Sequence, residues 1–298
     1  MNWNNILSNN MIPDILVTKL ESALDQTIES QRRVSGGSIN QAAKITLPGD
    51  RSCFLKWNTT ADPSMFFVEE KGLQLLDAAD TGLFIPGVLA TGETENGIGF
   101  LVQEFIKEGR AQNNSAEIFG QELAALHKNQ HEQFGLDHDN YIGRLPQSNK
   151  KHQSWIDFFI KERMKPQLKM ATDSGKLGTT TVSHFQSMYK QLPDIFPEEQ
   201  ASLLHGDLWG GNYFYDQNGR PTIYDPAVYY GHREIELAFT HLFGGFSGAF
   251  YDAYNEAYPL QPNFNQRKDI YNLYPLLVHT NLFGSSYAQQ VKGIVQQF

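Results

Sequence analysis

One short stretch of the sequence carries residues suited to phosphoryl transfer onto a hydroxyl group. The stretch is HGDLWGGN, from His205 to Asn212, and it places Asp207 and Asn212 five positions apart. A carboxylate can orient or accept the proton of an attacking hydroxyl, and an amide oxygen can hold a magnesium ion. We therefore take Asp207 as the candidate catalytic base and Asn212 as a candidate metal ligand.

The residues after Asn212 predict a β-hairpin that supplies a second metal ligand. Strands are expected at 213–215 and 221–224, joined by the turn Asp216-Gln217-Asn218-Gly219. Because an antiparallel hairpin brings its two ends together, Asp225 should lie beside Asn212. A carboxylate and an amide oxygen side by side are hard oxygen ligands that suit magnesium with its phosphates.

The alternative is that His-Gly-Asp forms an ordinary turn and that Asp225 is a loop acid. An isolated His-Gly-Asp tripeptide is a weak signal. Here, however, Asp207 and Asn212 share the spacing of the kinase catalytic loop H-R-D-x-x-x-x-N, and a second aspartate follows the hairpin. Asp225 precedes Pro226-Ala227, so it takes the place of the kinase D-F-G aspartate without that sequence. The combination favours the catalytic interpretation.

A lysine and a glutamate earlier in the chain form a second candidate site. Lys56 lies in a predicted strand at 52–57, and Asp62-Pro63 is a typical helix start. On that helix Glu69 shares a face with apolar residues, whereas Glu70 faces polar positions. A carboxylate on an apolar face needs a cation, so Glu69 is the expected partner of Lys56. Alone, Lys56 would be explained better as the solvent-facing residue of an alternating strand, but kinases use such a pair to hold the α- and β-phosphates.

The elements around Lys56 predict an antiparallel sheet. A helical apolar spacing over 3–30 is followed by strands on either side of Gly36-Gly37-Ser38. Glycine lets a backbone approach phosphates closely, although two glycines do not make G-x-G-x-x-G, and such a hairpin is commonly without function. A further strand at 99–106 ends on Glu104, Phe105 and Ile106, where we expect a hinge whose backbone binds the adenine edge. That role follows from the order of the elements alone.

Beyond the hinge the pattern becomes helical. Apolar spacing predicts helices from Ser115, around Trp155 to Met170, and at 234–243, 249–257 and 267–284, the last kinked at Pro275. His127 and His205 are expected to be structural. Strands first and helices afterwards predict an α+β, bilobal, protein-kinase-like fold. Its N-terminal antiparallel-sheet lobe, 1–106, would bind nucleotide, and its mainly helical C-terminal lobe, 107–298, would carry catalysis and substrate binding.

The bulk properties fit an enzyme of two lobes. A chain of 298 residues exceeds the usual size of one compact domain, and 40% hydrophobic residues can fill a sizeable core. A net charge of −9 argues against nucleic-acid and membrane-surface partners. The sequence has no apolar run of membrane-spanning length, and its first residues lack signal-peptide features. A single cysteine, Cys53, excludes an intramolecular disulfide, so we expect a cytoplasmic protein.

The chain resembles the fructosamine kinase (ketosamine-3-kinase) family, within the aminoglycoside-phosphotransferase and protein-kinase-like superfamily, over nearly its whole length. The matching stretches are GGSIN, MFFVEE with GL, FLVQEF, LAALH, NYIG with PQSN, HGDLWGGN, YDPAVYYGHRE, LFGGF and LYPLLVHTNLFGSSY. HGDLW followed by DPAVYYG is specific, because other small-molecule kinases of the superfamily tend to show HGDLH or HGDFH.

The resemblance implies ATP-dependent phosphorylation of the sugar 3-hydroxyl of a ketosamine, either a small molecule or a glycated protein lysine. The phosphate formed is unstable and releases the amine, so the activity counts as deglycation repair. ATP and Mg²⁺ would be used. Asp207 would be the base, Asn212 and Asp225 would hold the metal, and Trp209 and Glu234 would contact substrate. Trp209 could equally be a core residue that packs the catalytic loop.

Three positions depart from the family pattern. Ser38 stands where several members have cysteine, so a redox switch through that loop should be missing. Gly211, or else Gly210, replaces a usual serine in HGDLWSGN. His232 occupies a place often held by aspartate, which argues against a substrate contact there.

Other functions fit the same residues. The architecture could phosphorylate another small hydroxyl compound, such as an aminoglycoside or choline, or serve as a non-catalytic nucleotide-binding pseudokinase. Retention of Lys56, Asp207, Asn212 and Asp225 argues against the pseudokinase. The sequence does not distinguish fructosamine, ribulosamine and erythrulosamine substrates or fix the oligomeric state, for which a monomer is favoured.

Overall fold

The computed structural model describes residues 11–34 and 40–298. The chain divides into two compact units, one formed by Met1–Lys71 and Pro86–Ile106, the other by Gly72–Ile85 and Lys107–Phe298. The sequence-based lobe boundary assigned 72–85 to the first lobe, whereas the structure groups this segment with the second unit. The reason is backbone pairing, because Phe84 N donates to Pro221 O at 2.8 Å and Phe84 O accepts from Ile223 N at 3.1 Å.

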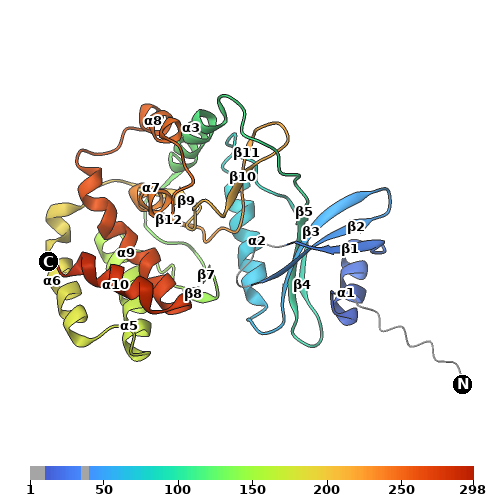
Figure 1. Cartoon of the computed structure of the whole chain (residues 1–298), viewed down its shortest axis with the longest axis horizontal. Coiled ribbons are helices and arrows are strands. Elements are labelled where there is room, and N and C mark those ends of the chain that lie inside the picture. The colour runs from blue at the N-terminus through green and yellow to red at the C-terminus, as the bar shows by residue number, and fades with distance from the viewer. Residues whose placement is uncertain (1–10, 35–39) are drawn as a thin grey trace, which may run out of the picture. The chain divides into compact units, whose positions relative to one another are not determined.

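The first unit is built on a five-stranded antiparallel sheet (Figure 1). The strands lie in the order β1-β2-β3-β5-β4, with all neighbours antiparallel. The elements are α1 Asp14–Leu24, β1 Ser30–Arg33, β2 Gln41–Leu47, β3 Arg51–Asn58, α2 Ser64–Asp77, β4 Val88–Glu93 and β5 Gly99–Glu104. Helix α2 begins in this unit and ends in the second, since the division falls after Lys71.

Alternation along the central strands separates the two faces of this sheet. Cys53, Leu55 and Trp57 of β3 are buried in one apolar cluster with Leu16 and Leu20 of α1. Lys56, between them in sequence, therefore projects from the opposite face. Helix α1 ends earlier than the pattern over 3–30 predicted, because Asp25 adopts a left-handed conformation with φ 52° and ends it.

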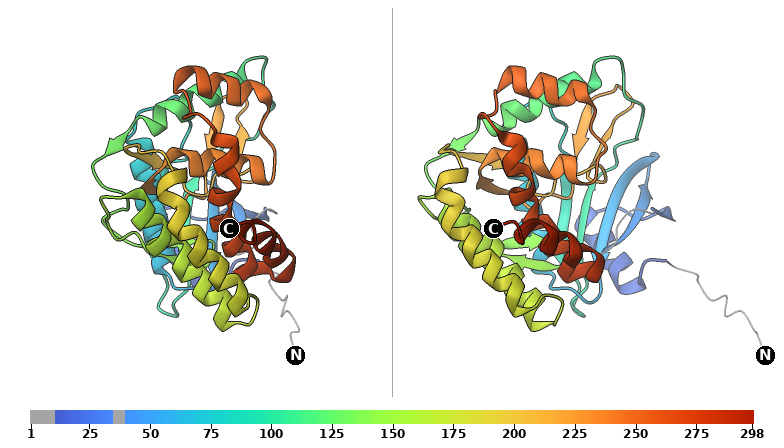
Figure 2. Two further views of the ribbon diagram at one scale, coloured as in Figure 1. Left: turned by 90° about the vertical axis from the view of Figure 1, so that its left-hand side faces the viewer. Right: turned by 60° about the vertical axis from the view of Figure 1, so that its left-hand side comes forward.

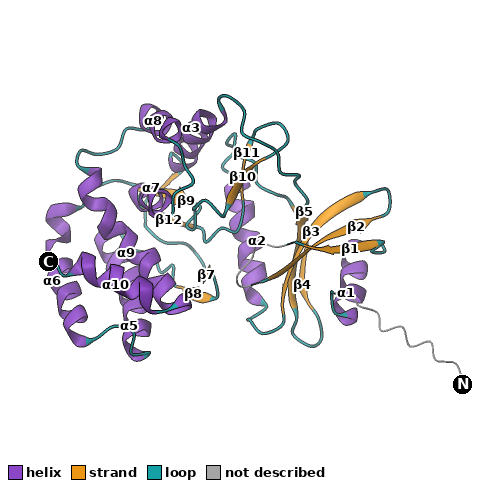
Figure 3. Ribbon diagram, in the orientation of Figure 1, coloured by secondary structure: helices purple, strands orange, loops and turns teal. Residues whose placement is uncertain are grey.

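The second unit is mainly helical, as the colouring by secondary structure shows (Figure 3). Its helices are α3 Ser115–His127, α4 Trp155–Phe158, a π-helical turn Phe159–Met164, α5 Lys165–Asp173, α6 Thr179–Ile195, α7 Arg233–Leu242, α8 Gly248–Ala257, α9 Phe264–Phe283 and α10 Ser285–Val295. Helices α3 and α8 lie side by side in every view (Figures 1 and 2). Helix α10 was not predicted; it is separated from α9 by Gly284, which has a φ of 106°.

Short strands connect the helices of the second unit. They are β6 Gln130–His131, β7 Asn140–Ile142, β8 Leu145–Gln147, β9 Ala201–Leu204, β10 Tyr213–Tyr215, β11 Pro221–Ile223 and β12 Tyr229–Gly231. They pair as β12-β9-β6, β7-β8 and β10-β11. Helix α9 is buried over most of its length and lies in the main apolar cluster of this unit. Within the described part of the chain, no helix is long and apolar enough to cross a bilayer.

Candidate active site

The hairpin β10–β11 brings the two predicted metal ligands to one place. Tyr213 pairs with Ile223, and beyond this pair Tyr224 N donates to Asn212 O at 3.1 Å. Asn212 therefore immediately precedes the outgoing strand, and Asp225 follows the returning one at the same end of the hairpin. This arrangement of the backbone is the one that the sequence predicted.

Asn212 also contacts the predicted base directly. Its amide nitrogen Nδ2 donates to Asp207 Oδ2 at 3.0 Å and to Asp207 O at 2.9 Å, and it lies 3.5 Å from Asp225 O. With the amide hydrogens directed at these oxygens, Oδ1 is the atom of Asn212 that can bind a cation. Asp225 has a φ of 57°, in the left-handed region that few non-glycine residues occupy and that is concentrated at functional sites.

The donor set fits magnesium. Asn212 and Asp225 offer an amide oxygen and a carboxylate, the hard oxygen donors that this ion prefers. Among the described residues, no group of three or more His, Cys, Asp and Glu could hold a metal. Two protein ligands suit an ion that takes its remaining ligands from phosphates and water, as magnesium does in nucleotide-dependent enzymes.

The backbone before Asp207 is fixed by a buried histidine and a glycine. His205 Nε2 donates to Tyr224 O at 2.9 Å, and its Nδ1 accepts from Asp207 N at 3.3 Å. Gly206 has a φ of 83°, and a Cβ at this position would lie 2.0 Å from Ala227 O. His205 therefore has the structural role that we expected, and the close approach at Gly206 requires glycine.

Glu236 of α7 is a member of the site that sequence reasoning missed. Its carboxylate accepts from Gly206 N at 2.6 Å, from His205 N at 3.2 Å and from His127 Nε2 at 2.9 Å. Burial alone would raise the pKa of Glu236, but the hydrogen bond and charge of His127, the charge of His205 and the Gly206 N–H together lower it. The buried carboxylate thus stays ionised and holds the catalytic loop against α7.

The environment of Asp207 favours a proton acceptor that works near neutral pH. The side chain is partly exposed, but the surrounding protein desolvates the carboxylate and raises the pKa of Asp207 to about 8. The hydrogen bond from Asn212 opposes this rise in pKa, and the negative charge of Glu236 adds to it. A general base is most effective when its pKa lies near the working pH.

The two predicted substrate residues lie in different environments. Trp209 is 38% exposed, so it is not a core residue, and its ring stands edge-on to Phe243 at 6.1 Å. The ring lies over Gly211, where a Cβ would come within 2.3 Å of it, so a serine at 211 would require the ring to shift. Glu234 is fully buried, and its carboxylate accepts from Arg267 at 2.6 and 2.7 Å. The expectation of a substrate contact by Glu234 does not fit this burial.

The predicted phosphate-binding pair forms within the first unit. Lys56 Nζ lies 2.5 Å from Glu69 Oε1, so the lysine pairs with the glutamate that helical spacing favoured over Glu70. Glu104, the first residue of the predicted hinge, accepts a hydrogen bond from Gly87 N through its side-chain Oε2 at 3.2 Å.

For the rest of the predicted nucleotide site, the structure gives few contacts at the end of the hinge and does not describe the glycine turn. Phe105 lies beneath Lys44 Nζ at 4.7 Å, and Ile106 is the last residue of the first unit. The predicted glycine turn, Gly36-Gly37-Ser38, lies outside the described residues.

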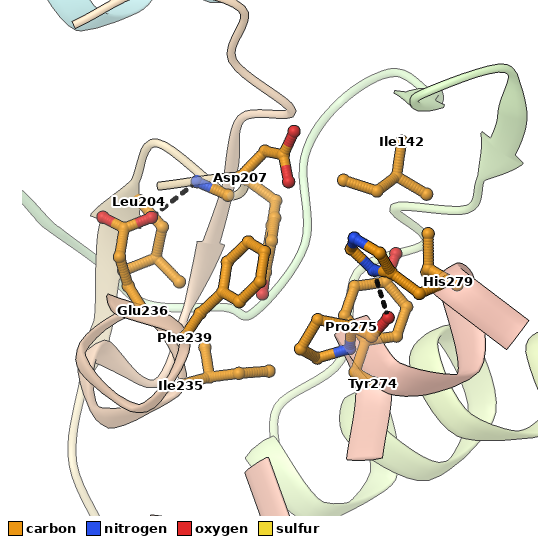
Figure 4. A pocket seen from close by; sticks show the side chains of 12 residues that line it. Ile142, Leu204, Asp207, Ile235, Glu236, Phe239, Tyr274, Pro275 and His279 are labelled. Atoms are coloured by element: carbon orange, nitrogen blue, oxygen red, sulfur yellow. Dashed lines mark hydrogen bonds between the residues drawn. The ribbon is translucent and has the colours of Figure 1, made fainter. Parts of the chain in front are cut away.

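A pocket opens beside Asp207 within the second unit (Figure 4). Together with the open solvent at its mouth, its empty volume is about 400 Å³, and most of its lining is aliphatic or aromatic. The lining residues are Ile142, Leu204, Gly206, Asp207, Tyr229, Ile235, Glu236, Phe239, Tyr274, Pro275, Val278 and His279. A substrate in this pocket would have Asp207 on one wall.

The fold is of the α+β, protein-kinase-like class, with an N-terminal antiparallel sheet and a mainly helical remainder. A crystal structure from Thermobifida fusca that carries a fructosamine-3-kinase assignment superimposes with a TM-score of 0.85 and 29% identity, covering 94% of this chain and 97% of that one. A probable ketoamine kinase of Synechocystis sp. is 40% identical over 91% of this chain and 90% of its own length. The chloroplastic protein-ribulosamine 3-kinase of Arabidopsis thaliana is 37% identical over 89% and 81% of the two chains.

The sequence model of the fructosamine kinase family matches residues 11–298. The chain belongs to the fructosamine kinase family. The family and the fold class expected from the sequence are thereby confirmed.

Proposed function

We propose that the protein is an ATP-dependent kinase that phosphorylates the sugar 3-hydroxyl of a ketosamine. The observation that carries this proposal is the hydrogen bond from Asn212 to Asp207 at the end of a hairpin that also ends on Asp225. This is the set of groups that phosphoryl transfer to a hydroxyl requires. The names of the Synechocystis and Arabidopsis relatives support a ketosamine as the acceptor and the 3-hydroxyl as the position.

Asp207 is the group that handles the proton. As the 3-hydroxyl oxygen bonds to the transferred phosphorus, its proton passes to the Asp207 carboxylate and ADP is the leaving group. The hydrogen bond from Asn212 holds this carboxylate in one orientation, and Glu236 fixes the backbone through Gly206 N. Correct placement of the base supplies much of the rate in such a reaction.

The remaining roles follow the same plan. Asn212 and Asp225 would hold magnesium, which neutralises phosphate charge when bound. Lys56, held by Glu69, would grip the α- and β-phosphates of ATP, and the backbone at 104–106 would bind the adenine edge. Exposed Trp209 would offer its ring face to sugar C–H groups. Loss of the unstable 3-phosphate then frees the amine, so we assign the protein to deglycation repair in the cytoplasm.

The test is direct phosphorylation of defined acceptors. The protein is incubated with ATP, magnesium and a panel of fructosamine-, ribulosamine- and erythrulosamine-lysines, and each product is analysed by mass spectrometry for a phosphate at sugar C3. An aminoglycoside and choline serve as comparison acceptors. Phosphate on a ketosamine is the expected result. Phosphorylation of a comparison acceptor alone, or ATP binding without transfer to any acceptor, would overturn the proposal.

A further inference from the structure

The pocket beside Asp207 has a second polar side chain on its wall. His279 of α9 faces Asp207 across the pocket, whose other lining is largely apolar (Figure 4). Glu236 also lines the pocket, but its carboxylate accepts from the backbone of His205 and Gly206. Asp207 and His279 therefore offer polar groups to a molecule in the pocket from two of its walls.

The tautomer of His279 is set by the helix that carries it. Its Nδ1 lies 2.7 Å from Pro275 O, and since a carbonyl oxygen accepts, Nδ1 must carry a hydrogen. Nε2 of the neutral ring is then a hydrogen-bond acceptor, and it is directed into the pocket (Figure 4). Burial lowers the pKa of His279, which favours this neutral form. The pocket thus offers a fixed acceptor on the wall opposite the base.

Aromatic rings surround His279 and continue to the molecular surface. Its ring centroid lies 4.8 Å from that of Phe243, 5.0 Å from Tyr287 and 5.5 Å from Phe283. Phe243 is 39% exposed and Phe283 is 53% exposed. A molecule that extends from the pocket past His279 would therefore meet exposed aromatic rings, whose faces attract cations.

This geometry matches one part of a ketosamine. When the 3-hydroxyl lies at Asp207, the amine on C1 is two carbons away, and its alkyl or protein substituent must leave the pocket towards solvent. At neutral pH this amine is a cation with N–H donors, which a neutral acceptor among aromatic rings can bind. Resting on the proposed function, we propose that His279 Nε2 accepts a hydrogen bond from the ammonium group of the ketosamine and so selects amine-bearing sugars.

The experiment compares two acceptors that differ only at this nitrogen. One is a 1-alkylamino-1-deoxyfructose, and the other is the neutral 1-O-alkyl ether of fructose, in which oxygen replaces the N–H group. Steady-state kcat and KM are measured for both with the wild type and with His279→Leu, which removes the acceptor, and His279→Gln, which keeps one. His241→Leu is the matched control, since His241 is exposed and stacks on Tyr251 away from the pocket lining.

The wild type should prefer the amine by about tenfold or more in kcat/KM, the expected effect of a hydrogen bond to a charged group. His279→Leu should lose that preference through a raised KM for the amine alone, His279→Gln should recover part of it, and His241→Leu should keep it. If His279→Leu slows both acceptors equally, or changes neither, the assignment is wrong while the proposed function stands. If the wild type phosphorylates neither acceptor, the proposed function fails together with the assignment.

Discussion

Replacing Glu236 with glutamine tests whether a buried carboxylate holds the catalytic loop. Glu236 is 3% exposed and accepts three hydrogen bonds, two from the backbone of His205 and Gly206 and one from His127. In Glu236→Gln one oxygen becomes an NH₂ group, so at least one buried donor loses its acceptor. The other two donors exchange a charged acceptor for a neutral one.

The three hydrogen bonds of Glu236 set the size of the expected loss of folding free energy. A buried donor left without an acceptor costs about 1–3 kcal/mol, and each weakened charge-assisted bond costs about 1 kcal/mol. We expect the free energy of unfolding to fall by about 3–5 kcal/mol, a large part of the roughly 5–15 kcal/mol typical of a folded protein. Since these bonds place Asp207, kcat should fall by about 10- to 100-fold.

Urea unfolding followed by tryptophan fluorescence measures the stability change, and initial rates measure kcat. Glu256→Gln is the control, because Glu256 lies exposed on α8 and its replacement should change stability by less than about 0.5 kcal/mol. A Glu236→Gln variant that keeps wild-type kcat and loses under about 1 kcal/mol would refute the reasoning.

Three further predictions concern the phosphate-binding lysine, the metal-binding aspartate and the single cysteine. Lys56→Met should raise the KM for ATP and lower kcat, because Glu69 would lose its cation and the ATP phosphates would lose the lysine that binds them. Unchanged ATP kinetics would contradict the assignment of Lys56 to phosphate binding. Asp225→Ala should abolish magnesium-dependent nucleotide binding measured by calorimetry, and retained binding would remove Asp225 from the metal site. Cys53 is buried, and burial raises the pKa of its thiol, so diamide should give no covalent dimer on a non-reducing gel. A dimer band that disappears in Cys53→Ser would show that the cysteine is reachable after all.

Residues close in sequence could be predicted because local rules place them. The hairpin fixes where Asn212 and Asp225 lie relative to each other, and turn residues mark the hairpin. Helical spacing distinguished Glu69 from Glu70, since one faces the apolar side of α2 and the other does not. The family motifs extended these local inferences to the fold, which the comparisons confirm.

The parts that were missed depend on contacts between distant segments. Glu236 binds backbone N–H groups 30 and 31 positions away, and backbone donors leave no pattern in the sequence. The same reason applies to the pairing of Glu234, whose partner Arg267 comes from another helix. A substrate contact by Glu234 was expected only because the family resemblance implies it. The role of His279 depends on a pocket formed by several elements, so spacing alone could not reveal it.

The most direct test of the account is the rate of phosphoryl transfer by Asp207→Asn. The substitution keeps the size of the side chain and removes its ability to accept the hydroxyl proton. ADP formation is measured at saturating ATP, magnesium and ketosamine, and ATP binding is measured separately by calorimetry. We predict a fall in kcat of about 100- to 10,000-fold with ATP affinity retained. A variant whose kcat stays within about tenfold of the wild type would show that Asp207 is not the general base.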